Sequence, residues 1–458
     1  MRRRLFGRAR HRRGPEPGGP AQVAPCEECA KEGVRPFGLL APPEPLVTAG
    51  DVLARTSGRL ETVVDGQLVE FDPGTGNAHL LNPSAALVLT SVDGRRTVGE
   101  IADELADETG VDRHVILRDV TDTLGTLLQG GLVTWFLSES APVEGERGRS
   151  TTHDRWAQVV ERRLDARDWP HVGPPRLAAG AGVLVRTDDE EVARRLDDAL
   201  DGLPAATSGS EVAMLSVDRR VVAGSIRFRV HAAGERVGWA DDRGHAIAFA
   251  LAGLNRLAAE GTHDRLLLHA GAVERDGRVA VIAGPSGRGK STLTAALVRA
   301  GARYLSDELA VVDPVTGDVT AYPKPFELDG DAVARLGLHD VVAPGPGPTP
   351  TGGIVGPTDV GEVGTGGVVA LLVLLDAPER GPSGTVDPVE LGPADAMLRL
   401  LRDVLPVSWS VPGVLDGLAA LCERVPALLV PRVDLDDAVG LVLDRLAAAG
   451  GNVGRDAP

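Results

Sequence analysis

Lysine, cysteine and long apolar runs are all scarce in this chain of 458 residues. Only three lysines, Lys31, Lys290 and Lys324, stand among 48 basic residues. Three cysteines in so long a chain cannot form a disulfide framework, which favours a reducing, cytoplasmic setting. The longest apolar run, over residues 368–375, is too short to cross a bilayer, so no membrane partner is expected.

The composition favours a globular protein with more than one domain. Hydrophobic residues make up 43% and charged residues 25% of a chain long enough for two or three domains. The net charge is −17, and so acidic a body is a poor partner for nucleic acid.

The first 50 residues are rich in Arg, Pro and Gly and show no periodicity, which predicts a largely disordered basic tail. Cys26 and Cys29 form a C-x-x-C pair within it. No second pair follows, so a flexible segment is favoured over half a metal site.

One stretch carries a clear chemical motif. An apolar run over 279–283 enters Gly284-Pro-Ser-Gly-Arg-Gly-Lys-Ser291, and a helical pattern follows. The spacing G-x-x-x-x-G-K-[ST] is that of a phosphate-binding loop (P-loop, Walker A), in which backbone N–H groups and a helix N-terminus surround a phosphate. Lys290 would reach the β- and γ-phosphates, and the Ser291 hydroxyl would ligate Mg²⁺.

ATP and Mg²⁺ are therefore the expected cofactors. The residues expected to bind the nucleotide are Gly284, Pro285, Ser286, Gly287, Arg288, Gly289, Lys290, Ser291 and Thr292. The alternative is an ordinary glycine-rich turn. A lysine at this position, in a chain that otherwise uses arginine, argues against that alternative.

Candidate catalytic side chains lie on either side of the loop. His269 belongs to a strand predicted over 266–273, and a short strand over 303–305 ends in Ser306, Asp307 and Glu308. Acids at the carboxyl end of a strand beside a P-loop suit Mg²⁺ and an attacking hydroxyl. The alternatives are a solvated turn for the two acids and a hydrogen-bonded core histidine for His269.

The run LLLHAGAV…GPSGRGKST…ARYLSDELAVV resembles the C-terminal domain of HPr kinase/phosphorylase. It looks most like the HPr-kinase-like enzymes of modified-peptide clusters, including those that phosphorylate lasso-peptide precursors. The resemblance implies that Asp307 is the general base, that His269 assists at the phosphoryl group and that Lys290 is the loop lysine.

The sequence departs from this family in two places. Glu308 stands where the family has a second aspartate, and a later Glu-x-Arg-Gly-x-Gly stretch with another metal ligand is not recognisable. The nearest carboxylate is Glu327, in a segment that also contains Lys324. The expected metal ligands are therefore Ser291, Glu308 and Glu327.

Residues 55–137 have a pattern of their own. Turn signals separate short strands over 61–82, and three helices are predicted at 83–92, 97–108 and 112–129. This order, with the pattern x-F-D-P-x-T-G-x-x-x-x-L-N-P-S-A-A-x-V, resembles the PqqD-like recognition elements of ribosomally made, modified peptides.

Such modules take up a leader peptide as a strand beside their third strand and against their third helix. By resemblance, the peptide-binding residues are His79, Leu80, Leu81, Leu117, Val120 and Leu124. The alternative for the helical positions is that they belong to the core, because their spacing buries one face of a helix.

The other segments complete an α/β fold class. We expect a linker over 138–175, a small α/β subdomain over 176–262 that supports or oligomerises the next domain, and an HPr-kinase-type P-loop domain over 263–448. Gly, Pro and Thr saturate 341–367, which predicts a flexible loop or lid. The N-terminal module is expected to be winged-helix-like.

Two functions are open from the sequence. The first is an ATP-dependent peptide serine kinase that phosphorylates a precursor peptide held through its leader, since tethering raises the effective concentration of the acceptor. The alternative is a non-catalytic ATP-binding scaffold that delivers the precursor to a partner modifying enzyme. A motor or transporter ATPase ranks last, because no second P-loop and no LSGGQ-like signature is found.

Overall fold

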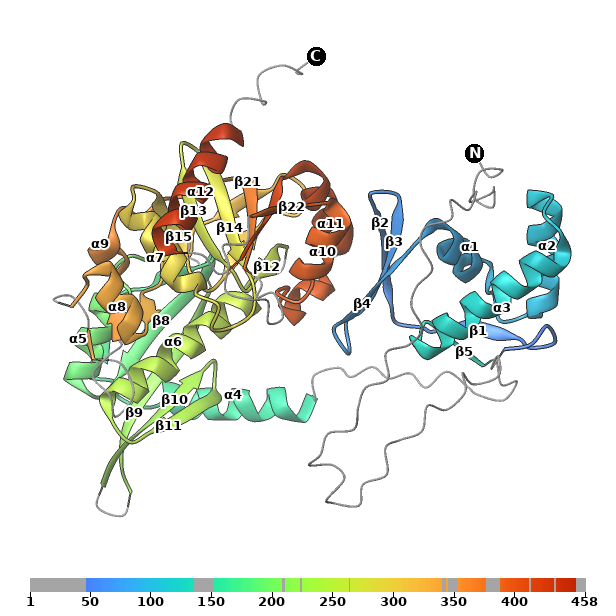
Figure 1. The fold of residues 1–458 in the computed structure, drawn as a ribbon. Helices are drawn as coiled ribbons and strands as arrows, with labels where there is room; N and C mark the ends of the chain where they lie inside the picture. The colour runs from blue at the N-terminus through green and yellow to red at the C-terminus, as the bar shows by residue number, and fades with distance from the viewer. Residues whose placement is uncertain are drawn as a thin grey trace, which may run out of the picture. The chain divides into compact units, whose positions relative to one another are not determined.

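The computed structural model describes residues 47–135, 151–207, 211–222, 225–262, 264–339, 343–344, 353–375, 388–411, 413–431 and 434–449. The chain divides into two compact units, which we describe separately (Figure 1). The helical unit comprises 1–59 and 81–143, and the P-loop unit comprises 60–80 and 144–458. The tail predicted over 1–50 lies, up to residue 46, outside the described residues.

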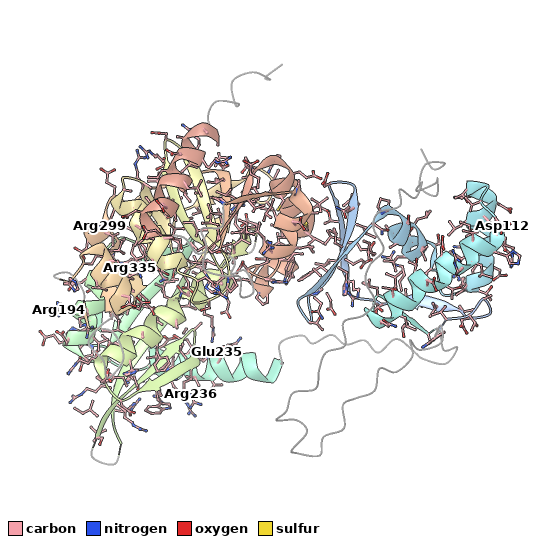
Figure 2. All side chains as sticks on the ribbon, viewed as in Figure 1. Asp112, Arg194, Glu235, Arg236, Arg299 and Arg335 are labelled. Carbon is pink, nitrogen blue, oxygen red and sulfur yellow. The ribbon has the colours of Figure 1, made fainter. Side chains whose placement is uncertain are left out.

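Three helices and a strand pair form the helical unit. They are α1 (Pro83–Ser91), α2 (Val98–Thr109), α3 (Arg113–Gln129) and the antiparallel strands β1 (Leu53–Arg55) and β5 (Val133–Trp135). The side chains of Asn82, Thr97 and Asp112 accept hydrogen bonds at the three helix starts. Figure 2 labels Asp112. These caps explain why the sequence predicted the helix boundaries to within about two residues.

A three-stranded sheet near the N-terminus belongs to the P-loop unit. Its strands, in spatial order, are β2 (Leu60–Val64), β3 (Gln67–Asp72) and β4 (Asn77–Leu81). Val64, Val69 and Phe71 are buried in one core cluster with helix α11 (Val414–Arg424). The sequence predicted this sheet as part of one module over 55–137, whereas in the structure its apolar face is buried in the core of the P-loop unit.

The segment predicted as an α/β subdomain has a mixed sheet in the order β11–β10–β9–β8–β6, with β7 beside β8. Its elements are α4 (Thr151–Asp165), β6 (His171–Val172), β7 (Arg176–Ala178), β8 (Ala181–Thr187), α5 (Glu190–Ala199), β9 (Val212–Val222), β10 (Ser225–Ala232), β11 (Glu235–Ala240) and α6 (Arg243–Glu260). Its core also contains Leu267 and Tyr322 of the P-loop domain. The subdomain therefore shares a core with its neighbour.

Helix α4 and strand β6 fall inside the segment predicted as a linker over 138–175. Arg186 on β8 forms ion pairs with Glu161 (2.6 Å) and Asp165 (2.7 Å) of α4. The linker prediction is wrong for these residues, because those ion pairs hold α4 to the sheet.

The P-loop domain is built on a nine-stranded sheet in the order β12–β16–β17–β21–β14–β13–β15, with β23 beside β21 and β22 beside β23. The strands are β12 (Leu266–Leu268), β13 (Gly271–Arg275), β14 (Arg278–Ala283), β15 (Arg303–Ser306), β16 (Ala310–Val312), β17 (Asp318–Thr320), β21 (Gly366–Leu375), β22 (Val389–Leu391) and β23 (Ala427–Val430). Strands β14, β21 and β23 are parallel. Their carboxyl ends therefore lie at one edge, where the loop after β14 begins.

Helices cover both faces of this sheet (Figure 1). Val279 and Val281 of β14 pack into a core with α10 (Pro393–Leu400) and α11. Ala280 and Ile282 pack into the other core, with α7 (Lys290–Arg299), α8 (Gly330–Leu336) and α12 (Leu435–Ala448). Buried on both faces, β14 is apolar throughout its centre.

The glycine-rich segment over 341–367 contains regular structure. Strand β20 (Gly353–Val355) lies between β18 (Phe326–Leu328) and β19 (Ala343–Pro344), and α9 (Pro357–Val360) follows. The prediction of a flexible loop is wrong over 353–367, because Ile354 and Val355 are buried between other elements.

The predicted α/β class is confirmed, with both a P-loop-bearing core and an N-terminal set of strands and helices. No helix in the described part of the chain is both long and apolar enough to cross a membrane.

Candidate active site

The phosphate loop adopts backbone angles that favour glycine. The φ angle is +75° at Gly287 and +88° at Gly289. At Gly284 a Cβ atom would lie 2.3 Å from the carbonyl oxygen of Leu375 on β21. Helix α7 begins directly after Gly289 without a side-chain cap, which leaves its first N–H groups free of capping side chains and available to an anion.

Lys290 folds back over this loop. Its Nζ donates a hydrogen bond to the carbonyl oxygen of Gly284 at 2.7 Å, and the residue is buried. Burial lowers the pKa of Lys290, and the negative charges of Asp403, Glu308 and Asp307 oppose this shift. Three carboxylates from two distant segments thus lie near the ammonium group.

His269 lies in the turn between β12 and β13 rather than within a strand as predicted. Its Nε2 is 3.4 Å from Oε1 of Glu308, and the two side chains are 40% and 41% exposed. Its backbone N–H donates to the carbonyl oxygen of Asp403 at 2.7 Å. The structure therefore brings His269 and Glu308 together at an accessible place beside the loop.

Asp403, just after α10, is a site residue that the sequence did not reveal. Burial raises the pKa of its carboxyl group, whereas Lys290, His269 and the N–H of Gly284 act to lower it. No motif marks Asp403, because only tertiary folding brings the end of α10 to the loop.

Asp307 follows β15 and is buried. Its Oδ1 lies 2.9 Å from the hydroxyl of Tyr304 and 3.1 Å from Nζ of Lys324. Ser306 Oγ accepts hydrogen bonds from the backbone N–H groups of Glu308 and Leu309, which fixes the turn. The sequence marked Lys324 only as a rare lysine and did not predict this ion pair.

Glu327, on β18, was predicted as a metal ligand. Burial together with Asp307 and Glu308 raises the pKa of Glu327, and Lys324 opposes the shift. Among the described residues, no three His, Cys, Asp or Glu side chains are grouped to hold a metal ion. Mg²⁺ sites commonly use only one or two carboxylates and complete the shell with phosphate and water. Ser291, Glu308 and Glu327 therefore stay predicted ligands.

The pKa values of the two lysines near the loop are expected to shift in opposite directions from that of an ordinary lysine. The pKa of Lys290 is lowered by burial, whereas at Lys324 nearby carboxylates outweigh burial and the pKa is raised. As the pH rises, Lys290 should lose its proton before Lys324 does. The ¹³Cε signals of labelled lysine, assigned with Lys290→Arg and Lys324→Arg, measure this order, and the reverse order would contradict the described contacts.

Two cavities flank the phosphate loop. One, of about 290 Å³, is lined by Gly284, Pro285 and Ser286 together with His269 and Asp403. The other, of about 270 Å³, is lined by Gly287, Arg288 and Gly289 and by apolar and charged side chains of α8 and α12, including Arg335 (Figure 2). The loop thus separates a cavity beside the candidate catalytic groups from one beside the start of α7.

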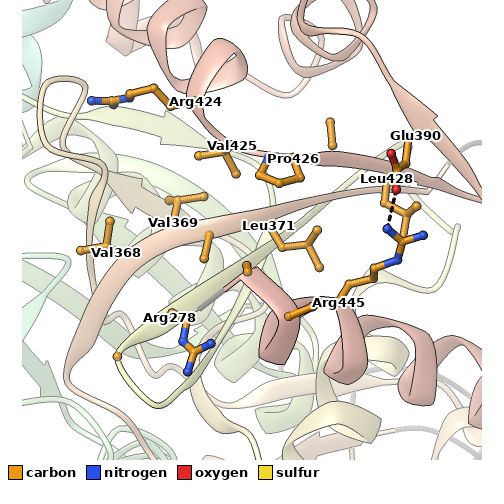
Figure 3. Close-up of a pocket in the computed structure, with 15 residues that line it drawn as sticks. Arg278, Val368, Val369, Leu371, Glu390, Arg424, Val425, Pro426, Leu428 and Arg445 are labelled. Carbon is orange, nitrogen blue, oxygen red and sulfur yellow. Dashed lines mark hydrogen bonds and ion pairs between the residues drawn. The ribbon is translucent and has the colours of Figure 1, made fainter. Parts of the chain in front are cut away.

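A larger cavity, of about 750 Å³, lies at the opposite, amino ends of β14, β21 and β23 (Figure 3). Val368, Val369 and Leu371 line it, with Arg278, Arg424 and the Arg445–Glu390 ion pair at its edges (Figure 3). None of the predicted site residues lines this cavity. Its size therefore does not make it the centre of the chemistry.

The predicted peptide-binding residues fall in both compact units. His79 and Leu80, on β4, belong to the P-loop unit, whereas the α3 residues belong to the helical unit. Val120 and Leu124 are fully buried and Leu117 is half-buried. Val120 and Leu124 thus contribute to the core of the helical unit, and the predicted peptide site stays a proposal.

Comparison with known proteins gave one family match and matches among solved structures. No curated protein matches the sequence. Among solved structures, the Hpr(Ser) kinase/phosphatase from Coxiella burnetii matches with 16% sequence identity over 40% of this chain and 93% of that chain, with a TM-score of 0.23. A TM-score this low does not establish a shared fold. Residues 67–133 match the family described as Coenzyme PQQ synthesis protein D (PqqD), and this segment is a PqqD domain.

Proposed function

We propose that the chain is an ATP-dependent kinase that phosphorylates a serine hydroxyl of a ribosomally made precursor peptide, held through its leader by the PqqD domain. The observation that carries the proposal is the convergence on one phosphate loop of Lys290, a His269–Glu308 pair and the carboxylates of Asp307 and Asp403. A turn that only bound phosphate would not require titratable groups from so many segments.

The loop fits the phosphates of ATP. Its uncapped helix start offers N–H donors, and the Lys290 ammonium lies on the loop itself. In the proposal the nucleoside occupies the cavity beside α8 and α12, and the acceptor hydroxyl enters the cavity beside His269. Ser291 and Glu308 would hold Mg²⁺, which neutralises charge on the phosphates when bound.

Each side chain then has a defined part. Asp307 accepts the proton of the attacking hydroxyl as the new bond to the γ-phosphorus forms and the bond to the bridging oxygen breaks, which releases ADP. Lys290 stabilises negative charge on the phosphoryl oxygens, and His269, oriented by Glu308, donates a hydrogen bond to them. The PqqD domain supports a peptide, rather than a small metabolite, as the acceptor.

Mass spectrometry of candidate precursor peptides incubated with the protein and Mg·ATP tests the proposal. We expect a mass gain of one phosphate on a serine, and a much slower gain when the leader is removed from the peptide. Omission of Mg²⁺ serves as the negative control. A protein that binds ATP and peptide yet phosphorylates none of the candidate precursors would favour the scaffold function instead.

A further inference from the structure

A buried ion pair between Lys324 and Asp307 lies near the loop, and no nucleotide-binding motif requires it. Lys324 is 1% exposed and Asp307 is 2% exposed, and Nζ of Lys324 lies 3.1 Å from Oδ1 of Asp307. Nζ also donates to the carbonyl oxygen of Pro325 at 3.1 Å. The hydroxyl of Tyr304 lies 2.9 Å from both Oδ1 of Asp307 and the carbonyl oxygen of Lys324. The buried side chains of Lys324 and Tyr304 thus meet at one oxygen of the buried Asp307 carboxylate.

The charges around Lys324 keep it an ammonium. Burial acts to lower its pKa, but the carboxylates of Asp307, Glu308 and Glu327 outweigh burial and raise it. Burial, followed by the charge of Asp307, raises the pKa of the Tyr304 and Tyr322 phenols, so both stay neutral. Lys324 is therefore the fixed positive charge beside the buried carboxylate, while Lys290 faces the loop.

Within the described part of the chain, the contacts of the Asp307 carboxylate with Tyr304 and Lys324 both use Oδ1. This arrangement fixes the plane of the carboxylate and leaves Oδ2 as the oxygen that can meet a substrate. We propose that Lys324 is a positioning residue that holds Asp307 by its Oδ1 so that Oδ2 takes the proton of the acceptor hydroxyl. The inference rests on the proposed function, and Lys324, itself enclosed, acts only through Asp307.

The surrounding carboxylates keep the charges balanced during this step. When the proton moves from the hydroxyl to Oδ2, Asp307 becomes neutral and Lys324 loses the partner that balanced it. Glu327, which also acts on Lys324, then offsets part of the ammonium charge. Lys324 thus neither gives nor takes a proton.

Lysine NMR tests the ion pair without any enzymatic turnover. The chain has only three lysines, so ¹³Cε-lysine labelling of the full chain gives at most three side-chain signals. Asp307→Asn should lower the pKa of Lys324, because the substitution removes a negative charge that opposes the effect of burial on this pKa. Tyr322→Phe is the matched control, since it removes a buried hydroxyl that bonds Asn255 at 2.7 Å and should leave the Lys324 titration unchanged. A Lys324 titration that does not change in Asp307→Asn would overturn the proposal.

A double-mutant cycle on Mg·ATP turnover, with water as the acceptor, tests the positioning role. Lys324→Met should lower turnover at least about tenfold with little change in the KM for ATP, and Lys324→Arg should retain more turnover. In an Asp307→Asn background, Lys324→Met should cause no further loss. Additive losses would show that Lys324 does not act through Asp307. An unaltered protein that neither hydrolyses ATP nor phosphorylates any candidate precursor would instead contradict the proposed function, while the NMR titration would still decide the ion pair.

Discussion

Asp307→Asn is expected to reduce peptide phosphorylation by about 10² to 10⁴-fold, the range typical for loss of a general base. The substitution keeps the size of the side chain but removes the charge that would take the hydroxyl proton. Binding of ATP should persist, because the phosphate loop and Lys290 are unchanged. Initial rates of phosphate transfer to the precursor, with ATP affinity measured separately by calorimetry, give the two quantities.

Loss of stability must be separated from loss of chemistry in this variant. Removing one partner of a buried ion pair typically costs about 3–5 kcal/mol, because the other charge is left unpaired. The double variant Asp307→Asn/Lys324→Met removes both charges and should recover much of that stability without recovering turnover. Asp444→Asn, at an exposed position on α12, is the surface control. Normal turnover in Asp307→Asn would exclude Asp307 as the base and favour the scaffold function.

Phe71→Ala is expected to destabilise the P-loop unit by about 3–5 kcal/mol, as for other large aromatic residues deleted from a core. Phe71 is 1% exposed, and its ring centroid lies 4.3 Å from that of Trp409 in the 3₁₀ helix η2 (Pro406–Ser410). Hydrogen exchange, measured for each proteolytic peptide by mass spectrometry, should show that the amides of η2 and α11 lose protection. Peptides of α2 and α3 in the helical unit should keep theirs.

Val63→Ala is the matched control for Phe71→Ala. Val63 lies on the neighbouring strand β2 but is 60% exposed, so its truncation should change the free energy of unfolding by no more than about 0.5 kcal/mol. If Phe71→Ala left α11 protected and loosened only α2 and α3, the sheet would belong to the helical unit after all.

Local sequence signals predicted the elements whose boundaries depend on local chemistry. The caps Thr97 and Asp112 mark helix starts that the structure reproduces, and the apolar run before Gly284 is strand β14. The turn after β14 could be predicted for the same reason, since Gly284, Gly287 and Gly289 adopt positive φ angles that glycine favours.

Contacts between distant segments could not be predicted in this way. Asp403 reaches the loop only because the stretch after α10 runs beside β12, where Leu405 N–H bonds the carbonyl oxygen of Leu267. Lys324 and Asp307 meet because β15 and β18 fold together. No motif with a fixed spacing in the sequence links these two residues. Composition was also misleading over 353–367, since the glycine content concealed three buried apolar residues, Ile354, Val355 and Val360.

The sheet β2–β4 limits how recognition specificity can be exchanged among such chains. The match to PqqD begins at residue 67, within this sheet, yet Thr62 Oγ1 donates to Asp416 and the Asp65 N–H donates to Glu423, both on α11. A graft that replaced residues 55–137 as one block would substitute the surface that covers α11. Under the proposed function, hybrid proteins designed to hold another leader should therefore keep the α11-facing side chains of β2 and β3 and take the rest from the donor.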